Sequence, residues 1–485
     1  MMNKLIQKIT KKSYFILAFS ILFISFYSCV PSQQLIRNEN KIVPKNFNSK
    51  ISDSLNSAKI NWKNFFSDAN LVALIDTALV NNQELNIISQ QINRAKNEIG
   101  IRKGEYLPFV NIYAGSEFEK VGEFTRNGAV ERNLNIRENE EFPEPLPNFS
   151  VGLAASWELD VWKKLRNGKK AATLEYLSSI EGKNFMVTNL VAEIASSYYE
   201  LQALDNQLLI INENLELQQN ALKMVKLQKE AARATQLAVR RFEAEVFKNQ
   251  SNQFRIQQQI VETENKINFL IGHYPKKIPR DSENFISKKI DTIFTGIPSQ
   301  LLANRPDIRQ AEYELQASKL NVAIAKANFY PSIGIKAGVG LEAFQPKFLT
   351  HTPESLLYSL VGDVVGPLIN RNAIKATYKS ANAKQLQAVF EYEKSILNGF
   401  MEVSNELSNI SNLKKSYDLK EQQVNALKES INLSLQLFRS ARVEYTEVLF
   451  VQREALDSKL EIVETKRDQL LANVKLYQTL GGGWQ

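Results

Sequence analysis

Two tracts without glycine or proline constrain this chain more than any other feature of its sequence. Lys183–Ile271 contains neither residue, and neither does Phe400–Leu480. Helices in globular proteins average about 11 to 12 residues, so uninterrupted tracts of this size predict very long helices. For a chain of 485 residues, we therefore expect an elongated architecture instead of two to four ordinary globular domains.

The first tract has a period of 3.5 residues. Steps of four and three residues reach eleven positions, nine of them apolar: Leu190, Ile194, Ser197, Leu201, Leu204, Leu208, Ile211, Leu215, Gln218, Leu222 and Val225. Such a period, sustained over several heptads, is typical of a coiled-coil seam. A similar seam begins in the second tract at Ile396, Phe400, Val403, Leu407 and Ile410. Periodicity alone leaves open an ordinary helical hairpin in a soluble bundle.

Four short segments have a period of two instead. Two of them follow Pro108 and Pro331, which lie 223 positions apart, and apolar residues alternate there with polar or small ones. The others are Asn148–Trp162, which alternates regularly, and Ser355–Leu368, which is less regular. Each has roughly the 9 to 11 residues that a tilted transmembrane strand requires, although strands of soluble sandwiches alternate too.

The number of these strands has a consequence for assembly. Four strands cannot close a barrel by themselves, and an open sheet edge in lipid leaves unsatisfied backbone groups that cost several kcal/mol each. The membrane interpretation therefore requires strands from other subunits. The segments between the paired strands are polar and contain proline, as expected of exposed loops.

The chain also contains an internal two-fold sequence repeat. At the offset of 223, Glu84 falls on Asp307 and Tyr106 falls on Phe329. The offset then contracts, and we expect INFLIG, which ends at Gly272, to correspond to YQTLGG, which ends at Gly482. Each copy is predicted to contain a helix, a strand pair and a long helical hairpin. The first copy covers 70–272 with strands near 106–162, and the second covers 301–485 with strands near 329–368, after a linker at 273–300.

The N-terminus has the pattern of a targeting segment. Lysines at positions 4, 8, 11 and 12 precede the uncharged run Tyr14–Tyr27, which indicates a secretory signal peptide at 1–28. Cys29, the only cysteine, follows directly and has no partner for an intramolecular disulfide. SFYSC resembles a bacterial lipobox, in which the thiol is diacylated; a chance cysteine is the alternative. Two acyl chains would anchor the segment 29–69 stably to a membrane.

Charge and histidine content argue against nucleic-acid binding and catalysis. The formal charge of +8 falls to +4 without the four signal lysines, and the remaining charges are interleaved along the helical tracts. His273 and His351 are the only histidines, so the sequence has almost no residues for a metal site or a catalytic triad. Glu158 and Asp160 share a strand face, which a polar barrel interior explains better than an acid–base pair. We expect no enzyme activity, no cofactor and no metal site.

Five motifs occur in order between Ser156 and Leu456. They are SWELDVW from Ser156, ANRPDIRQAEYEL from Ala303, ANFYPSIGI from Ala327, VGPL from Val365 and SARVEYTEVLFVQREAL from Ser440. Together they resemble the outer-membrane efflux protein family, the TolC-like channels, and particularly its lipoprotein branch that serves resistance-nodulation-division (RND) pumps.

This resemblance implies an α+β membrane protein that assembles as a homotrimer. Four strands per chain would form a twelve-stranded transmembrane β-barrel in the outer membrane of a Gram-negative bacterium. The barrel would continue into a long α-helical coiled-coil barrel in the periplasm, with an equatorial region around the linker. The expected function is that of a passive duct, which carries small molecules from a periplasmic adaptor and an RND pump to the exterior. Alternatives are a type I secretion duct and a lipid-anchored coiled-coil tether without a pore.

The resemblance also implies a gate where the helical hairpins turn. Relatives often carry a carboxylate at the position of Phe450, and commonly glycine at the turns, where this chain has Ala and Arg. Glu447 lies one helical turn before Phe450, so both are expected on the lumen side and would form rings in a trimer. Acidic rings attract cations, and apolar rings can close a passage by dewetting. The alternative is that Phe450 packs in the coiled-coil seam and Glu447 is an ordinary solvated charge.

Overall fold

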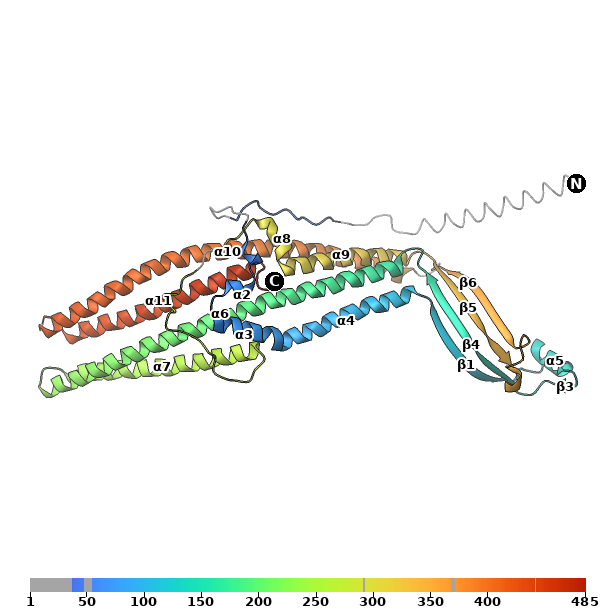
Figure 1. Cartoon of the computed structure of the whole chain (residues 1–485), viewed down its shortest axis with the longest axis horizontal. Coiled ribbons are helices and arrows are strands. Elements are labelled where there is room, and N and C mark those ends of the chain that lie inside the picture. The colour runs from blue at the N-terminus through green and yellow to red at the C-terminus, as the bar shows by residue number, and fades with distance from the viewer. Residues whose placement is uncertain (1–36, 48–54, 291–292, 368–370, 441) are drawn as a thin grey trace. The chain divides into compact units, whose positions relative to one another are not determined.

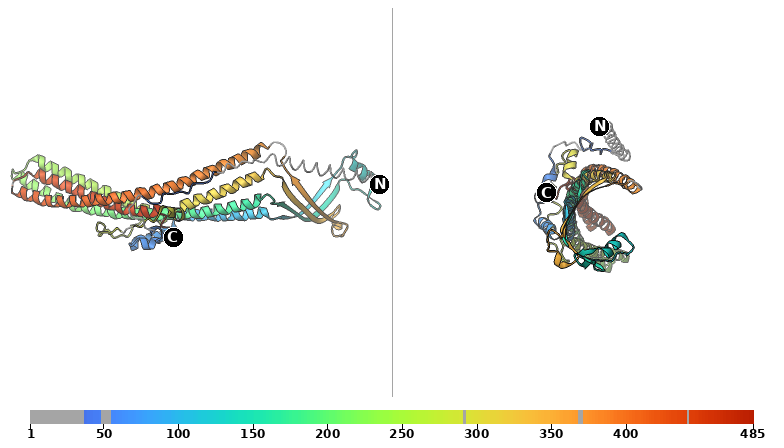
Figure 2. Two further views of the ribbon diagram at one scale, coloured as in Figure 1. Left: turned by 90° about the horizontal axis from the view of Figure 1, so that it is seen from above. Right: turned by 90° about the vertical axis from the view of Figure 1, so that its right-hand side faces the viewer.

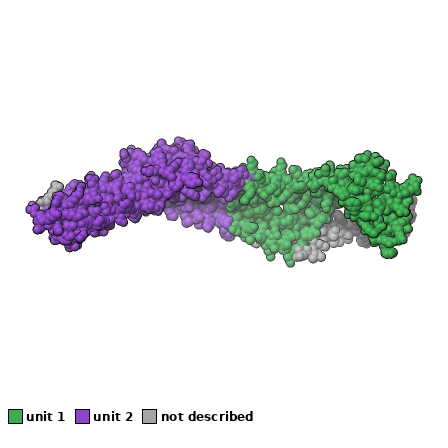
Figure 3. Space-filling model, turned by 90° about the horizontal axis from the view of Figure 1, so that it is seen from below, with its two compact units in different colours: residues 1–38, 94–176, 314–389 green, residues 39–93, 177–313, 390–485 purple. Residues whose placement is uncertain are grey.

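The structure, a computed structural model, divides the chain into two units (Figure 3). The described residues are 37–47, 55–290, 293–367, 371–440 and 442–485. Of these, unit 1 comprises residues from 37–38, 94–176 and 314–389, and unit 2 comprises residues from 39–93, 177–313 and 390–485. The predicted signal peptide and Cys29 lie outside the described residues.

Unit 1 contains a four-stranded antiparallel sheet, which is curved and twisted (Figures 1 and 2). In spatial order its strands are β1 (Phe109–Glu119), β4 (Leu146–Leu159), β5 (Ser332–Ala343) and β6 (Leu356–Val365). The four segments predicted as strands are therefore confirmed, although β4 ends three residues before the predicted Trp162. Since β1 and β6 form the edges of this sheet, each has one side without a partner strand in it.

The strand register places like residues on the same face. On the apolar face, neighbours across β4 and β5 are Val151–Leu341, Leu153–Val339 and Trp157–Ile335. On the opposite face, which we call the polar face, neighbours are Gly152–Gly340, Ala154–Gly338 and Ser156–Lys336. A slip of one residue would exchange the two faces, so the alternation in the sequence specifies this register.

The loops between the paired strands differ in length and content. The loop 120–145, between β1 and β4, contains α5 (Arg126–Asn133) and a small hairpin of β2 (Asn135–Arg137) and β3 (Glu140–Glu141). The shorter loop 344–355 contains η3 (Pro346–Phe348). The two loops touch, because the guanidinium of Arg137 lies 4.4 Å from the centroid of the Phe348 ring. The sequence did not predict the helix or the small hairpin.

The repeat is visible in the bounds of the elements. Helices α4 (Gln83–Tyr106) and α9 (Pro306–Ala327) begin 223 residues apart, and so do β1 and β5 after them. The long helices that follow the sheet are α6 (Lys164–Glu230) and α10 (Asn372–Arg439). They are followed by α7 (Gln236–Leu270) and α11 (Tyr445–Thr479), both of 35 residues and 209 apart. The offset between the two copies falls from 223 to 209 residues between the paired strands, because the first loop is longer than the second.

The expected correspondence between Gly272 and Gly482 was wrong by one residue. Gly272 and Gly481 follow the C-caps of α7 and α11, and both have positive φ, +72° and +91°. A Cβ at Gly272 would lie 2.6 Å from the carbonyl oxygen of Asn81, and a Cβ at Gly481 would lie 2.5 Å from that of Asn304. Three consecutive glycines made the alignment ambiguous, whereas helix termination requires the left-handed residue at the first of them.

In unit 2, α6 from residue 177 on pairs with α7, and α10 from residue 390 on pairs with α11, so that two long helical hairpins form. The turn 231–235 of the first hairpin lies where the sequence predicted it, and in the second hairpin α10 ends at Arg439 and α11 begins at Tyr445, on either side of the other predicted turn. Of the eleven predicted seam positions on α6, nine are buried, and Leu208 and Leu222 are half-buried. The seam prediction is therefore confirmed, including its two polar members.

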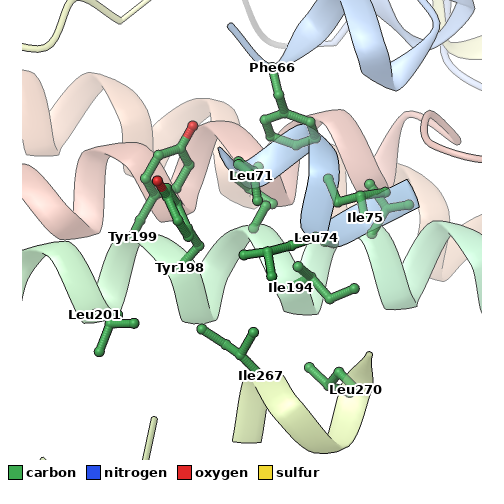
Figure 4. Packing of buried hydrophobic residues seen from close by; sticks show 14 of the residues in the cluster. Phe66, Leu71, Leu74, Ile75, Ile194, Tyr198, Tyr199, Leu201, Ile267 and Leu270 are labelled. Carbon is green, nitrogen blue, oxygen red and sulfur yellow. The ribbon is translucent and has the colours of Figure 1, made fainter. Parts of the chain in front are cut away.

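The main core of unit 2 lies where α3 (Ala69–Asn81) packs on the hairpin helices (Figure 4). Asp68 caps α3 by accepting hydrogen bonds from the backbone N–H groups of Asn70 and Leu71. The helix buries Leu71 and Ile75 completely. Burial of such a side chain contributes about 1.5 to 3 kcal/mol, so this short helix is held by packing as well as by its cap.

The linker after the first copy is fixed within unit 2 by Arg280. Its guanidinium contacts Asp205 of α6, with an Nε to Oδ2 distance of 2.6 Å, and Glu264 of α7. The hydrogen bonds to Asp205 raise the pKa of Arg280, although its burial acts in the opposite direction. A single side chain thus connects the linker to both helices of the first hairpin.

Candidate channel wall and hairpin gate

The polar face of the sheet and the nearby helix residues line a cavity of about 780 Å³ in unit 1. The charged residues of its wall are Glu98, Arg102, Glu105, Glu158, Lys164, Glu175, Lys336 and Asp363. Five of these are acidic and three are basic. The apolar face carries no such group in the central strands, so the sheet has one side suited to water and one suited to lipid.

Several of these charges form ion pairs across the wall. Lys336 Nζ lies 3.0 Å from Asp363 Oδ2, between β5 and β6. Gly334 makes room for this contact, because a Cβ there would meet the Asp363 carboxylate. Exposed ion pairs contribute only about 0 to 1 kcal/mol each to stability. Each pair also cancels one positive and one negative charge on the wall.

Asp160 does not share the role of Glu158. The expectation that both face a polar interior from one strand was wrong for Asp160, because β4 ends at Leu159. Its carboxylate accepts hydrogen bonds from the backbone N–H groups of Leu165 and Arg166, at 2.9 Å each, and so caps the first turn of α6. Burial alone would raise the pKa of Asp160, but these hydrogen bonds and the Arg166 guanidinium hold it below its usual value.

The ends of the two hairpins pack together around aromatic side chains. Val225 of α6 and Val239 and Phe242 of α7 are buried, with Tyr445 and Leu449 of α11 packed against them. The Tyr445 ring lies 4.6 Å from that of Phe242, measured between centroids. Burial in this cluster raises the pKa of the Tyr445 hydroxyl to about 12.

The two predicted gate residues lie on the first turns of α11. Glu447 is in the first turn, and both it and Phe450 are exposed on the single chain, Phe450 by 56%. Val448, between them, is completely buried. Glu447 lines a groove of about 520 Å³ between α10 and α11. Neither gate residue is therefore taken up by the packing of its own chain.

A buried polar pair lies in the seam of the first hairpin. The side-chain amide of Asn249 donates a hydrogen bond to Gln218 Oε1 at 2.9 Å, and both side chains are about 1% exposed. Gln218 stood out in the sequence as a polar seam position, but its partner on α7 could not be deduced from the period of α6. Such a pair fixes the register of two helices more than their stability.

The family profile for outer membrane efflux proteins matches residues 74–273 and 297–482, which covers both copies of the repeat and most of the chain. The chain belongs to the outer membrane efflux protein family. The family consists of outer-membrane channels of Gram-negative bacteria and not of enzymes. Export through the outer membrane is therefore the function of this efflux channel.

Individual relatives agree with this assignment. The efflux channel is 26% identical over 447 residues to the cation efflux system protein CusC of Escherichia coli O6:H1, covering 91% of this chain and 93% of that protein. It is 25% identical over 475 residues to the probable outer membrane lipoprotein SilC of Salmonella typhimurium, covering 97% and 98%. Its fold matches the open state of the Neisseria gonorrhoeae MtrE outer membrane channel, with a TM-score of 0.81, 22% identity and coverage of 94% and 98%.

The remaining features concern the long helices and the histidines. Within the part of the chain that the structure describes, no helix is sufficiently long and apolar to cross a membrane, and no three metal-ligating side chains gather. His273 follows α7 in unit 2, whereas His351 lies in the loop 344–355 of unit 1, where its ring contacts Phe348. The two histidines are thus parts of separate local structures.

Proposed function

We propose that this efflux channel is the outer-membrane duct of a tripartite efflux system and acts as a homotrimer. The observation that carries the proposal is the four-stranded sheet of unit 1, with one apolar face, one polar face and two edges, β1 and β6, that lack a partner in the sheet. In lipid these edges must be paired. Three copies supply twelve strands, whose polar faces would enclose a water-filled lumen.

The partners follow from the same assignment. The duct would receive small molecules or ions from a periplasmic adaptor and an inner-membrane RND pump, and the pump would select the cargo. CusC is named for cation efflux, which favours export of ions or small molecules over type I secretion. We keep the proposed division into a lipid-anchored segment 29–69, copies 70–272 and 301–485, and an equatorial linker 273–300.

Two sites complete the proposal. Cys29 would carry the lipid anchor in the outer membrane, as the lipobox-like SFYSC suggests, and the relative SilC is itself named a probable lipoprotein. The hairpin ends would form the periplasmic gate, with Glu447 and Phe450 repeated three times around the axis. The exposure of both side chains on the single chain leaves them available for such rings.

Two measurements test the proposal. The mass of the purified protein in detergent should be that of a trimer, and a monodisperse monomer would contradict it. Affinity purification from crosslinked cells should recover an adaptor and an RND pump. Recovery of an ABC transporter instead would indicate type I secretion, and a protein that forms no ion-conducting channel would indicate a tether.

A further inference from the structure

The polar face of the sheet changes character at its edges. On the two central strands this face carries mainly small residues, among them Gly152, Ala154 and Ser156 of β4 and Gly334, Gly338 and Gly340 of β5. On the edge strand β6, the same face carries the large apolar residues Leu357, Val361 and Val365, which alternate with Ser359 and Asp363, and β1 begins with Phe109 on this face. Large apolar side chains are therefore present among polar ones on this face where the sheet of one chain stops, whereas the central strands carry none at the facing positions.

These edge residues are uncovered in the single chain. Phe109 is 55% exposed, Val361 is 52% exposed and Val365 is 63% exposed. Phe109 lies opposite Ser156 and Val365 lies opposite Ser332, so both side chains belong to the polar face and not to the apolar one. Leaving such side chains in water forgoes the hydrophobic free energy that burial would supply. A covering surface at the two edges would recover part of this free energy.

The side chain of Tyr113, unlike that of Phe109, packs over the neighbouring strands of its own sheet. It lies on the polar face of β1 and extends over the neighbouring strands, because a Cβ at Gly152 would be 2.8 Å from its hydroxyl oxygen and a Cβ at Gly340 would be 3.0 Å away. The glycines of β4 and β5 thus provide room for Tyr113. Phe109, four residues earlier, stays more than half exposed.

We propose that the covering surface is β1 of a second copy of this chain, paired with β6 so that Val365 lies opposite Phe109. This inference rests on the trimer proposed above and adds the register of its seams. The order β1-β4-β5-β6 makes β6 of one copy antiparallel to β1 of the next. The polar faces of two copies form one continuous surface only when polar-face residues of β6 lie opposite polar-face residues of β1. Val365 and Phe109 both belong to the polar face, so this pairing meets the condition.

Strand length selects this register among those that match faces. With Val365 opposite Phe109, all ten residues of β6 pair with β1, from Val365–Phe109 to Leu356–Phe118. Val361 then lies opposite Tyr113. Within one chain, a straight row of opposing residues runs across the four strands from Phe109 to Val361, through Ser156 and Lys336. If this row continued straight into the next copy, Val361 would lie opposite Phe109 of that copy. In that register β6 would extend four residues past the start of β1 and leave its end unpaired.

Barrel geometry supports the same choice. In the proposed register, the row that starts at Phe109 of one copy arrives at Tyr113 of the next copy, which is a displacement of four residues along the strand. Three such displacements give a shear of roughly 12 for 12 strands, which corresponds to a strand tilt of about 35° with a rise of about 3.3 Å and a spacing of about 4.8 Å. Transmembrane barrels have tilts of about 35 to 45°. The straight row would give no shear and therefore upright strands.

Disulfide trapping tests the register in the full-length chain with Cys29→Ser. The pair Phe109→Cys with Val365→Cys should give covalent dimers and trimers on non-reducing gels. In the control pair, Phe109→Cys with Val361→Cys, the cysteines would be about 13 Å apart along the seam, too far for a disulfide. Neither pair can close within one chain, because two strands separate β1 from β6.

A second pair, Tyr113→Cys with Val361→Cys, should also crosslink. It provides an independent test of the same register if one of the other variants does not fold. Native mass is measured for every variant. Trimers that crosslink through the control pair, or through no pair, would overturn the register but leave the proposed trimer intact. An absence of trimers in the parent protein would contradict both.

Discussion

Asn249 and Gln218 are hydrogen-bonded to each other at 2.9 Å inside the seam of the first hairpin, one from each helix. Because both are buried, loss of one leaves the other without its partner in a dry environment. Gln218→Leu should therefore destabilise the protein by about 1 to 3 kcal/mol. Thermal melting followed by helical circular dichroism measures this effect. Gln219→Leu, at the exposed neighbouring position, is the matched control and should change little.

The double variant Gln218→Leu with Asn249→Leu separates the two effects. With both polar groups gone, most of the lost stability should return, because no buried polar atom is left unsatisfied. The pair would then matter for register rather than for stability. If the double variant melts as early as the sum of the single variants predicts, the hydrogen bond is not the cause.

The turn of the first hairpin contains an alanine in a left-handed conformation. Ala232 has φ of +55°, where a side chain is unfavourable and glycine is not. Ala232→Gly should therefore stabilise the protein by about 0.5 to 1 kcal/mol. Ala231→Gly is the control and should not stabilise, because Ala231 is not among the residues with positive φ. Equal melting temperatures for wild type and Ala232→Gly would show that the turn relaxes.

Asp160 gives a prediction for pH. Its pKa is lower in the folded state than in the unfolded state, so its contribution to stability is present above the unfolded value and is lost as the pH falls through the folded value. Asp160→Ala should cost about 1 to 2 kcal/mol at pH 7, as expected for a lost helix cap. The difference from wild type should shrink below about pH 4. A difference independent of pH would rule out the ionised carboxylate as its source.

The hairpin residues give a prediction for conduction. Glu447→Ala should lower cation selectivity in planar bilayers, because a ring of three carboxylates would be lost. Phe450→Ala should raise conductance in the absence of the pump, because an apolar constriction would be removed. Glu429→Ala is a control on exposed α10 surface and should change neither property. Wild-type behaviour of both hairpin variants would place the gate elsewhere.

The lipid anchor is tested separately from the fold. Cys29→Ser should abolish incorporation of labelled palmitate, because the chain has no other thiol. The variant should still form trimers, since the barrel strands do not use this residue. Equal labelling of variant and wild type would contradict the lipoprotein assignment.

Much of the architecture follows from two periods in the sequence. The heptad positions on α6 specify the seam, and the alternation in β1, β4 and β5 specifies the sheet. When only one face of a strand is apolar, a single register keeps the apolar residues together on that face. Proline then marks where helices give way to strands, as Pro108 does between α4 and β1. These are local signals, and a single sequence is enough to detect them.

Contacts between segments distant in sequence were not predictable in the same way. Nothing in the period of α6 identifies Asn249 as the partner of Gln218, and nothing near Arg280 points to Asp205. Asp160 was misassigned because an alternating strand and the cap that follows it look alike in sequence. The helix in the loop 120–145 was missed because it is short and largely polar, and so has no apolar period.

Electrical recording from the purified protein in planar lipid bilayers tests the central claim most directly, because only a closed barrel with a polar interior passes ions. The account predicts discrete conductance steps from preparations that contain the trimer, and none from the monomer. A correctly folded trimer that inserts into bilayers and never conducts, even with Phe450→Ala, would contradict the assignment of this chain as a duct.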